Sequence, residues 1–316
     1  MSFKKIYFRI ILGVFLSLFL FWKSAFFQEE TLPKPGLTPD SPFYFLEIIA
    51  EKIGNFFTFG NEAEAKRMLT LADERMAEIY QMLKEKKIKP AQKGINRYQG
   101  HLQEYEKILK KMENEKESIV EVVQKGIIIT EKHLAILEKI SGSFPSETKP
   151  LISQIAKICL KTQNEAIFIM SKNNLREGLN FQFRLMEQRL ERIKTNLKNK
   201  NFIAAKASLK SYEQSLEKLN FLLEAARKTN TNITDYELMT LIKTTRFIKS
   251  LWLFYKSTKS PLQRDLLITI WKLMKNYYKI KNSVGRKIKK FKKGTLLPPE
   301  LERKIKKEIQ RIQSSP

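Results

Sequence analysis

The chain is poor in the residues that build disulfides, metal centres and most catalytic sites. Its 316 residues include one cysteine, Cys159, and two histidines, His101 and His133. A single cysteine excludes an intrachain disulfide and a cysteine-built metal site. No H-E-x-x-H, G-x-S-x-G or P-loop motif occurs. The sequence therefore predicts no metal, no cofactor and no catalytic residue, and an enzyme is the least favoured class of function.

Glycine and proline are also scarce, at 11 residues each, which argues against collagen-like chains and turn-rich β proteins. Hydrophobic residues make up 42% of the chain, which is enough for a sizeable core. No segment shows the alternation of apolar and polar residues that is typical of a strand. We therefore expect an all-α protein.

Apolar residues recur at helical spacing along most of the chain. One such stripe, Phe45, Ile49, Ile53 and Phe56, follows Pro42 and is expected to form part of the core, with a ligand-binding aromatic patch at this helix start as the alternative. The predicted helices cover residues 42–57, 61–87, 90–116, 118–140, 150–172, 175–198, 201–227, 234–259, 261–293 and 298–313. The predicted units are an anchor or signal segment at 1–27, a linker at 28–40, helical units at 41–140 and 141–233, and a basic region at 234–316.

The amino-terminal segment has the composition of a membrane anchor or a secretory signal. Residues 10–22 carry no charge, a length that suits a signal peptide. Residues 6–27 are long enough to span a bilayer if Arg9 and Lys23 reach the headgroups. No A-x-A pattern marks a cleavage site, which favours an uncleaved anchor. A cleaved signal followed by secretion, and a buried amino-terminal helix, are the alternatives.

Positive charges before this segment, Lys4 and Lys5, predict a cytoplasmic amino terminus. The bulk of the chain then lies outside the cytoplasmic membrane. Residues 28–40 contain Pro33 and Pro35 and no apolar period, so they read as a linker between the membrane lipid and the helical part.

Two segments resemble each other when the sequence is shifted by 114 positions. Arg75 then meets Arg189, Tyr98 meets Tyr212, and a lysine-bearing turn of equal length separates the helices in each copy. We interpret the two segments as duplicated helical hairpins. A chance alignment of amphipathic helices is the alternative, and it accounts poorly for the turn and the tyrosines. Because one hairpin cannot bury both apolar faces, we expect the two copies to pack together as a four-helix unit.

The motif SPFYFL at residues 41–46, with FFTF at 56–59 and AEAKR at 63–67, resembles an uncharacterised bacterial family. That family is a domain of unknown function with an amino-terminal "LPDSPFYFLK…FFTF" pattern, and the resemblance covers about residues 35–110. Its members usually lie just outside a signal or anchor segment. The resemblance therefore implies a secreted or membrane-tethered helical protein of the bacterial envelope, and it implies no catalytic residue.

The few chemically reactive side chains are expected to be structural. Cys159 lies on an apolar helix face, which predicts a buried thiol. His101 and Glu104 lie one helical turn apart, but their order is the reverse of the di-iron pattern and no second pair occurs. Both histidines are expected at the surface.

Positive charge is concentrated at the carboxy-terminal end. The chain carries a net charge of +26, and residues 240–316 contribute 21 lysines and arginines against four acids, a net +17. The candidate polyanion-binding residues are Lys256, Lys275, Lys279, Arg286, Lys287, Lys289, Lys290, Lys292 and Lys293, and the candidate interfacial aromatic residues are Trp252 and Trp271.

Three interpretations of this basic region compete: a solvated face of an ordinary bundle, a surface for anionic lipid, wall polymer or nucleic acid, and a second membrane span. The span is excluded because Lys243, Arg246 and Lys249 interrupt it. We expect a single-pass, membrane-anchored extracytoplasmic scaffold or interaction protein without catalytic activity. A polyanion-binding protein is the alternative, and the sequence does not identify a protein partner.

Overall fold

A computed structural model describes residues 31–228, 233–258, 261–285 and 296–313. These residues form α-helices and one short 3-10 helix and contain no strand, which confirms the all-α prediction. The helices are α2 (Tyr44–Phe56), α3 (Asn61–Lys84), α4 (Ile88–Asn114), α5 (Val120–Ile140), η1 (Ser146–Thr148), α6 (Lys149–Asn173), α7 (Leu175–Lys198), α8 (Phe202–Lys228), α9 (Thr234–Ser257), α10 (Gln263–Val284) and α11 (Pro299–Gln313).

The predicted membrane anchor at 1–27 lies outside the described residues. Among the helices that the structure describes, none combines the length and the apolar character that a membrane span requires. The helix predicted at 261–293 is shorter in the structure. It ends at Val284, where Gly285 adopts φ 51° and ψ −127°, a backbone conformation that glycine allows and that does not continue a helix.

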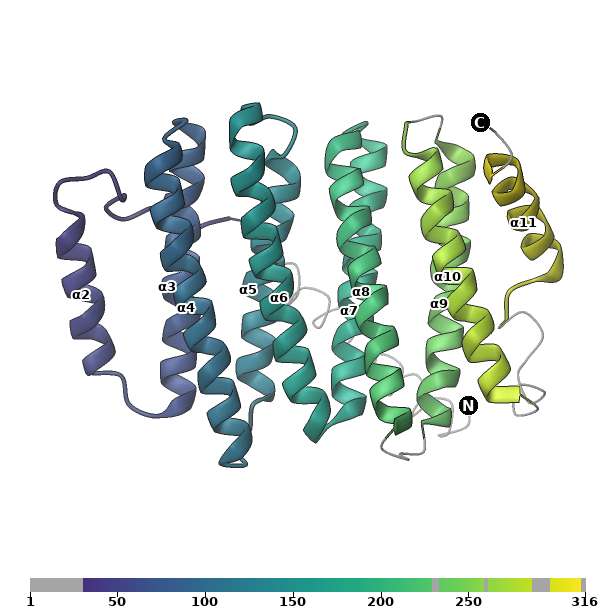
Figure 1. Cartoon of the computed structure of the whole chain (residues 1–316), viewed down its shortest axis with the longest axis horizontal. Helices are drawn as coiled ribbons and strands as arrows, with labels where there is room; N and C mark the ends of the chain where they lie inside the picture. Colours follow the sequence, from purple (N-terminus) through teal and green to yellow (C-terminus); the bar gives the residue numbers. More distant parts are fainter. Residues whose placement is uncertain (1–30, 229–232, 259–260, 286–295, 314–316) are drawn as a thin grey trace, which may run out of the picture.

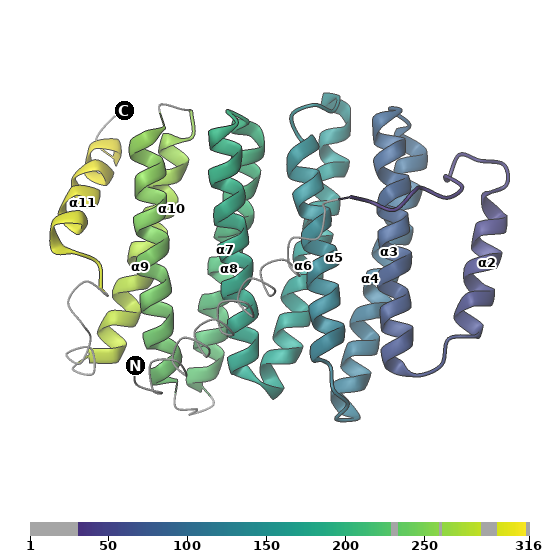
Figure 2. The same ribbon diagram turned by 180° about the vertical axis from the view of Figure 1, so that it is seen from behind.

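The helices pair into hairpins that lie side by side along the long axis of the molecule (Figure 1). In order, the hairpins are α3/α4, α5/α6, α7/α8 and α9/α10, with α2 at one end and α11 at the other (Figure 2). One hydrophobic core runs through the array from Ala65 to Ile309. The predicted unit boundary at residue 140 falls inside the α5/α6 hairpin, and this hairpin separates the two that were expected to pack together.

The two hairpins that resemble each other in sequence also match in structure. α7 and α8 begin and end 114 residues after α3 and α4. The turns match as well, because Lys86 and Lys200 both have a positive φ, of 60° and 56°. Tyr98 and Tyr212 are both fully buried. The correspondence continues further than the sequence indicated, since α9 and α10 begin 114 residues after α5 and α6.

The turns that contain Lys86 and Lys200 terminate α3 and α7, the first helix of each of these two hairpins. In each, the lysine N–H bonds a carbonyl three residues back, and the next N–H bonds one five residues back, as in Lys86 to Leu83 and Lys87 to Met82. This is the Schellman arrangement, in which glycine usually occupies the left-handed position. Lysine at this position satisfies the terminal carbonyls and keeps the side chain in solvent.

A close helix contact depends on a glycine in α5. A Cβ atom built on Gly126 would lie 2.3 Å from the hydroxyl oxygen of Tyr105, whose buried ring reaches from α4. We expect Gly126→Ala to lower the free energy of unfolding by about 1–3 kcal/mol, because overpacking outweighs the better helix propensity of alanine. Gly100→Ala is the matched control, since nothing lies within 4 Å of its Cβ position. It should stabilise by up to about 1 kcal/mol in chemical unfolding. Equal effects of the two changes would contradict the contact.

The apolar stripe of α2 faces solvent, which corrects the prediction that it belongs to the core. Phe45, Ile49, Ile53 and Phe56 are 48–74% exposed. The opposite, polar side of the helix faces α3 and α4, because Arg75 is buried there and binds the α2 residues Tyr44 and Glu47. The helix is therefore attached by its polar side chains, and its apolar side is left uncovered.

At the other end of the array, the amphipathic helix α11 covers the hydrophobic core. α11 is strongly amphipathic, and Ile305 and Ile309 are buried against the core while its charged residues face outward. Terminal helices of repeat arrays normally present such a polar outer side. In the described part of the chain, the α11 end meets this expectation and the α2 end does not.

Candidate functional site

A large groove lined by many charged side chains opens between α5 and α7, on the side of the array formed by the first helix of each hairpin. Its volume is about 2030 Å³, and it reaches from Asp73 on α3 to Lys243 on α9. Seven acidic and seven basic side chains line it. The charges on the walls are therefore balanced, although the whole chain has a net charge of +26.

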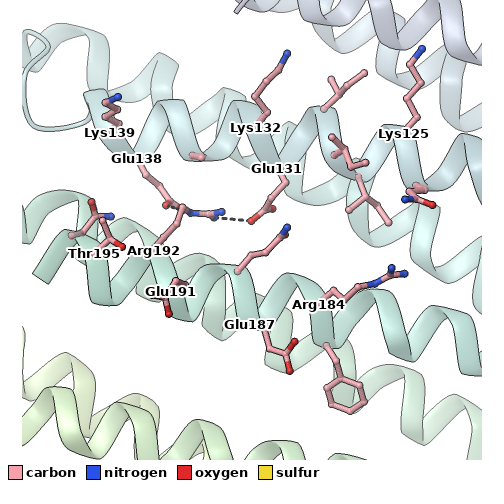
Figure 3. Close-up of a pocket in the computed structure, with 18 of the residues that line it drawn as sticks. Lys125, Glu131, Lys132, Glu138, Lys139, Arg184, Glu187, Glu191, Arg192 and Thr195 are labelled. Carbon is pink, nitrogen blue, oxygen red and sulfur yellow. Dashed lines mark hydrogen bonds and ion pairs between the residues drawn. The ribbon is translucent and has the colours of Figure 1, made fainter. Parts of the chain in front are cut away.

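The groove walls follow from residue spacing on the two helices. On α5, Lys125, Ile128, Lys132, Ala135 and Lys139 recur at three- and four-residue intervals, so they share one helical face. On α7 the residues at the same kind of spacing are Glu177, Asn180, Arg184, Glu187, Glu191 and Thr195. Figure 3 shows Glu131 and Glu138 of α5 and Arg192 of α7 pointing toward one another between the two helices, whereas Lys125 and Lys132 project away from α7.

Buried ion pairs join α7 to α5 at the base of the groove. Arg189 donates to Glu131 through Nη2 and Nε, at 2.7 and 3.1 Å, and also donates to Gln163 at 2.7 Å. Burial alone would raise the pKa of Glu131, but the charges of Arg189 and Arg192 and their hydrogen bonds outweigh it and lower the pKa to about 2. Glu131 is thus ionised throughout the range in which the protein is expected to be folded.

Arg192 lies between two glutamates one heptad apart on α5. It contacts Glu131 at 2.7 Å and Glu138 at 2.9 Å (Figure 3). Glu138 also accepts hydrogen bonds from Ser208 and Ser211 of α8, at 2.6 and 3.0 Å. The network fixes the separation of the groove walls, because each charge has partners on the opposite side.

A buried chain of hydrogen bonds leads from the groove into the core. His133 Nε2 lies 2.8 Å from Asp73, His133 Nδ1 lies 3.0 Å from the Tyr98 hydroxyl, and that hydroxyl lies 3.0 Å from the Cys159 sulfur. A neutral histidine donating to Asp73 and accepting from Tyr98 satisfies every group. Lys132, on the groove wall, also binds Asp73.

The position of His133 corrects the surface prediction, because its side chain is fully buried. Burial lowers the pKa of His133, and the neighbouring Asp73 opposes this only in part. Cys159 is buried as expected, and burial raises the pKa of its thiol to about 12. Such a thiol is neither accessible nor ionised, so this chain of groups is structural.

His101 is also largely covered, in a second charged cluster beneath α2. It lies beside Arg97 and 3.8 Å from Glu51, and burial together with Arg97 and Arg75 lowers its pKa to about 4. In the same cluster Arg75 contacts Glu78 at 2.7 Å and Glu51 at 3.3 Å. Burial raises the pKa of Glu78 to about 8, since Arg75 is shared among several carboxylates. This cluster attaches α2 to the array.

Of the candidate polyanion-binding residues, the described part of the chain contains Lys256, Lys275 and Lys279, and each has a partner within the protein. Lys279 pairs with Glu224 of α8, Lys275 lies 3.5 Å from the centre of the Trp271 ring, and Lys256 lies 5.6 Å from that of Trp252. Trp252 is only 8% exposed and stacks on Tyr255, so it belongs to the core. Trp271 is half-buried against the core. The basic run from Arg286 to Lys293 lies outside the described residues.

Comparison with known proteins connects the first part of the chain to a family. Residues 36–134 match the family described as "Domain of unknown function (DUF5667)". The matched residues run from the segment before α2 into α5 and so include the α2 attachment cluster and the part of the α5 groove wall up to Lys132. The match supports the resemblance to an uncharacterised domain and extends it past residue 110. Neither the curated proteins nor the solved structures contain a match to the chain.

The size of the groove and the charges on its walls indicate what kind of molecule could fit it. Among the described residues, no three His, Cys, Asp or Glu side chains converge in a way that would hold a metal ion. The volume of the groove is well above the roughly 300–1,000 Å³ of typical small-molecule sites. Its walls offer charged groups of both signs at helical spacing. These properties suit a segment of another protein, either a helix or an extended strand with mixed charges.

Proposed function

We propose that the protein is a membrane-anchored, extracytoplasmic helical scaffold that binds a partner protein in the groove between α5 and α7. The observation that carries this proposal is the groove itself, with fourteen charged residues of balanced sign on walls that a buried ion-pair network joins at the base. A scaffold needs a fixed surface, and this network supplies it. No catalytic role is proposed.

Anchoring through residues 6–27 is part of the proposal and rests on their sequence. We infer further that the helical part is a tandem of two four-helix units, α3–α6 and α7–α10, because all four helix starts recur after 114 residues. The groove then lies at the junction of the two units. Repeat arrays commonly bind their partners on extended surfaces that run across neighbouring repeats.

Site-specific photo-cross-linking tests the groove directly. A benzophenone side chain at Lys139 or Asn180, both on the groove walls, should capture the same partner in intact envelopes. The matched control is Lys161, an exposed residue of α6 outside the groove, which should capture at least tenfold less. Equal capture from all three positions would contradict a groove-specific partner.

Two further experiments test the basic run and the membrane anchor independently of the groove. Neutralising Lys287, Lys289, Lys290, Lys292 and Lys293 should leave capture in the groove unchanged, whereas a loss would assign binding to the basic run and to a polyanion. The protein should also remain in the membrane after carbonate washing. Its release would contradict the anchor without affecting the groove.

A further inference from the structure

The end of the array at α2 carries the most extensive uncovered apolar surface in the described part of the chain. Eight large apolar side chains in and beside this helix are 48–77% exposed. They are Phe43, Phe45, Leu46, Ile49, Ile53, Phe56, Phe57 and Phe59. At about 200 Å² per large side chain they present on the order of 900 Å², more than the largest apolar patch on a typical monomer. A surface of this size requires a partner.

These eight residues are arranged symmetrically about position 51. Antiparallel pairing of α2 with itself sets residue 46 opposite 56 and 49 opposite 53 within the helix, and the same symmetry relates 45 to 57 and 43 to 59 at its two ends. Every pair joins two large apolar residues. A two-fold symmetric contact requires this relation, because residue i of one copy meets residue j of the other and j meets i.

The local charge favours a second copy over an anionic lipid surface. Residues 31–67 contain four basic and five acidic side chains, a net charge of −1, although the whole chain carries +26. Two α2 ends therefore meet without strong repulsion. Helices that lie on anionic membranes usually carry lysine and arginine on the polar face. The polar face of α2 carries Glu47 and Glu51 instead.

We propose that α2 of one copy packs antiparallel on α2 of a second copy, which joins two hairpin arrays end to end in a two-fold symmetric dimer. The surface available, on the order of 900 Å² per copy, is close to the roughly 800 Å² per partner of a stable interface. The attachment of α2 by its polar side leaves this apolar face free for the contact. The dimer does not depend on the groove or on its partner.

Cysteine cross-linking tests the pairing in full-length protein embedded in lipid vesicles. In a Cys159→Ala background, one tagged copy carries Leu46→Cys and a second carries Phe56→Cys. The mixed pair should cross-link at least tenfold more than either variant with itself. Like positions are separated by ten residues along antiparallel helices, about 15 Å. Cross-linking of like positions at equal or higher yield would overturn the antiparallel arrangement.

Two substitutions test whether the apolar face carries the contact. Ile49→Glu should abolish the mixed cross-link, whereas Leu253→Glu, which alters a 66% exposed apolar residue of α9, should leave it intact. Circular dichroism checks that both variants keep their helices, and the milder Ile49→Gln replaces Ile49→Glu if it does not fold. A mixed cross-link that survives every change at Ile49 would overturn the proposal. Quenching of a label at position 53 by lipid-attached quenchers, without cross-linking, would overturn it in favour of a membrane contact.

Discussion

Arg189→Met is expected to lower the free energy of unfolding by about 3–5 kcal/mol. The guanidinium is 2% exposed and binds Glu131 and Gln163, and it also donates to the carbonyl of Ser211 at 2.9 Å. Methionine fills similar space but leaves a carboxylate and a carbonyl buried beside an apolar group. Breaking a buried ion pair by removing one partner typically costs this much. Chemical unfolding followed by circular dichroism in detergent measures the change.

The control for this substitution is Lys194→Met, on the same helix. Lys194 pairs with Glu191 at 3.1 Å, but both side chains are more than half exposed. Exposed pairs contribute little, so the control should change the free energy of unfolding by less than about 1 kcal/mol. A loss of less than about 1 kcal/mol for Arg189→Met as well would show that the network at the base of the groove does not hold α7 to α5.

The same network predicts an acid-dependent loss of stability. The pKa of Glu131 is about 2 in the folded protein against an ordinary value of 4.5, so the unfolded state binds more protons between these values. Ionised Glu131 contributes about 3 kcal/mol to the free energy of unfolding. This contribution is complete above pH 4.5 and is lost as the pH falls toward 2. In Glu131→Gln this part of the pH dependence should be absent.

Arg75→Met is expected to release α2 while the rest of the array stays folded. Arg75 has no exposed surface and contacts Glu47, Glu51 and Glu78, at 2.8, 3.3 and 2.7 Å. Without the cation the α2 side chains Glu47 and Glu51 lose their buried partner and repel one another, and α2 has almost no apolar side turned inward to hold it. A cost of about 3 kcal/mol corresponds to roughly 100-fold faster amide exchange in α2. Hydrogen–deuterium exchange by mass spectrometry measures this, with α7 to α10 unchanged.

The comparison variant is Arg67→Met, which also contacts α2. Arg67 donates to Asn55 at 2.7 Å and to the Glu51 carbonyl at 3.4 Å but is only partly buried, so its loss should raise exchange in α2 by less than tenfold. If exchange spreads through the whole chain after Arg75→Met, the cluster supports the global fold and not α2 alone. If neither variant alters exchange in α2, the helix is held by other contacts.

Helix positions and the repeat could be predicted from the sequence because both depend on local spacing. The apolar period placed α7 at Leu175–Lys198, as the structure has it. The shift of 114 residues predicted equal turns, and Lys86 and Lys200 confirm them. The burial of Cys159 followed from its apolar neighbours. None of these features depends on which helices are neighbours in space.

The orientation of α2 and the groove could not be predicted, because each depends on residues far apart in the sequence. The stripe at Phe45 and Ile49 has the pattern of a core face. The distant Arg75 requires carboxylate partners, so the polar side of α2 faces the array and the apolar side faces solvent. The groove likewise requires that α5/α6 lie between the two similar hairpins. One usable signal was present, since Glu131 and Glu138 are acidic residues one heptad apart in a helix rich in apolar residues.

Because the charges in the groove are balanced, we expect salt to affect the association rate and the dissociation rate of a partner differently. The net charge of +26 attracts an acidic partner from a distance, and this long-range steering weakens as salt rises. Inside the groove the walls carry seven charges of each sign, and several of them are buried in ion pairs with one another. Salt should therefore slow association markedly and change dissociation little. A partner captured in this groove would stay bound under conditions in which it is no longer efficiently recruited.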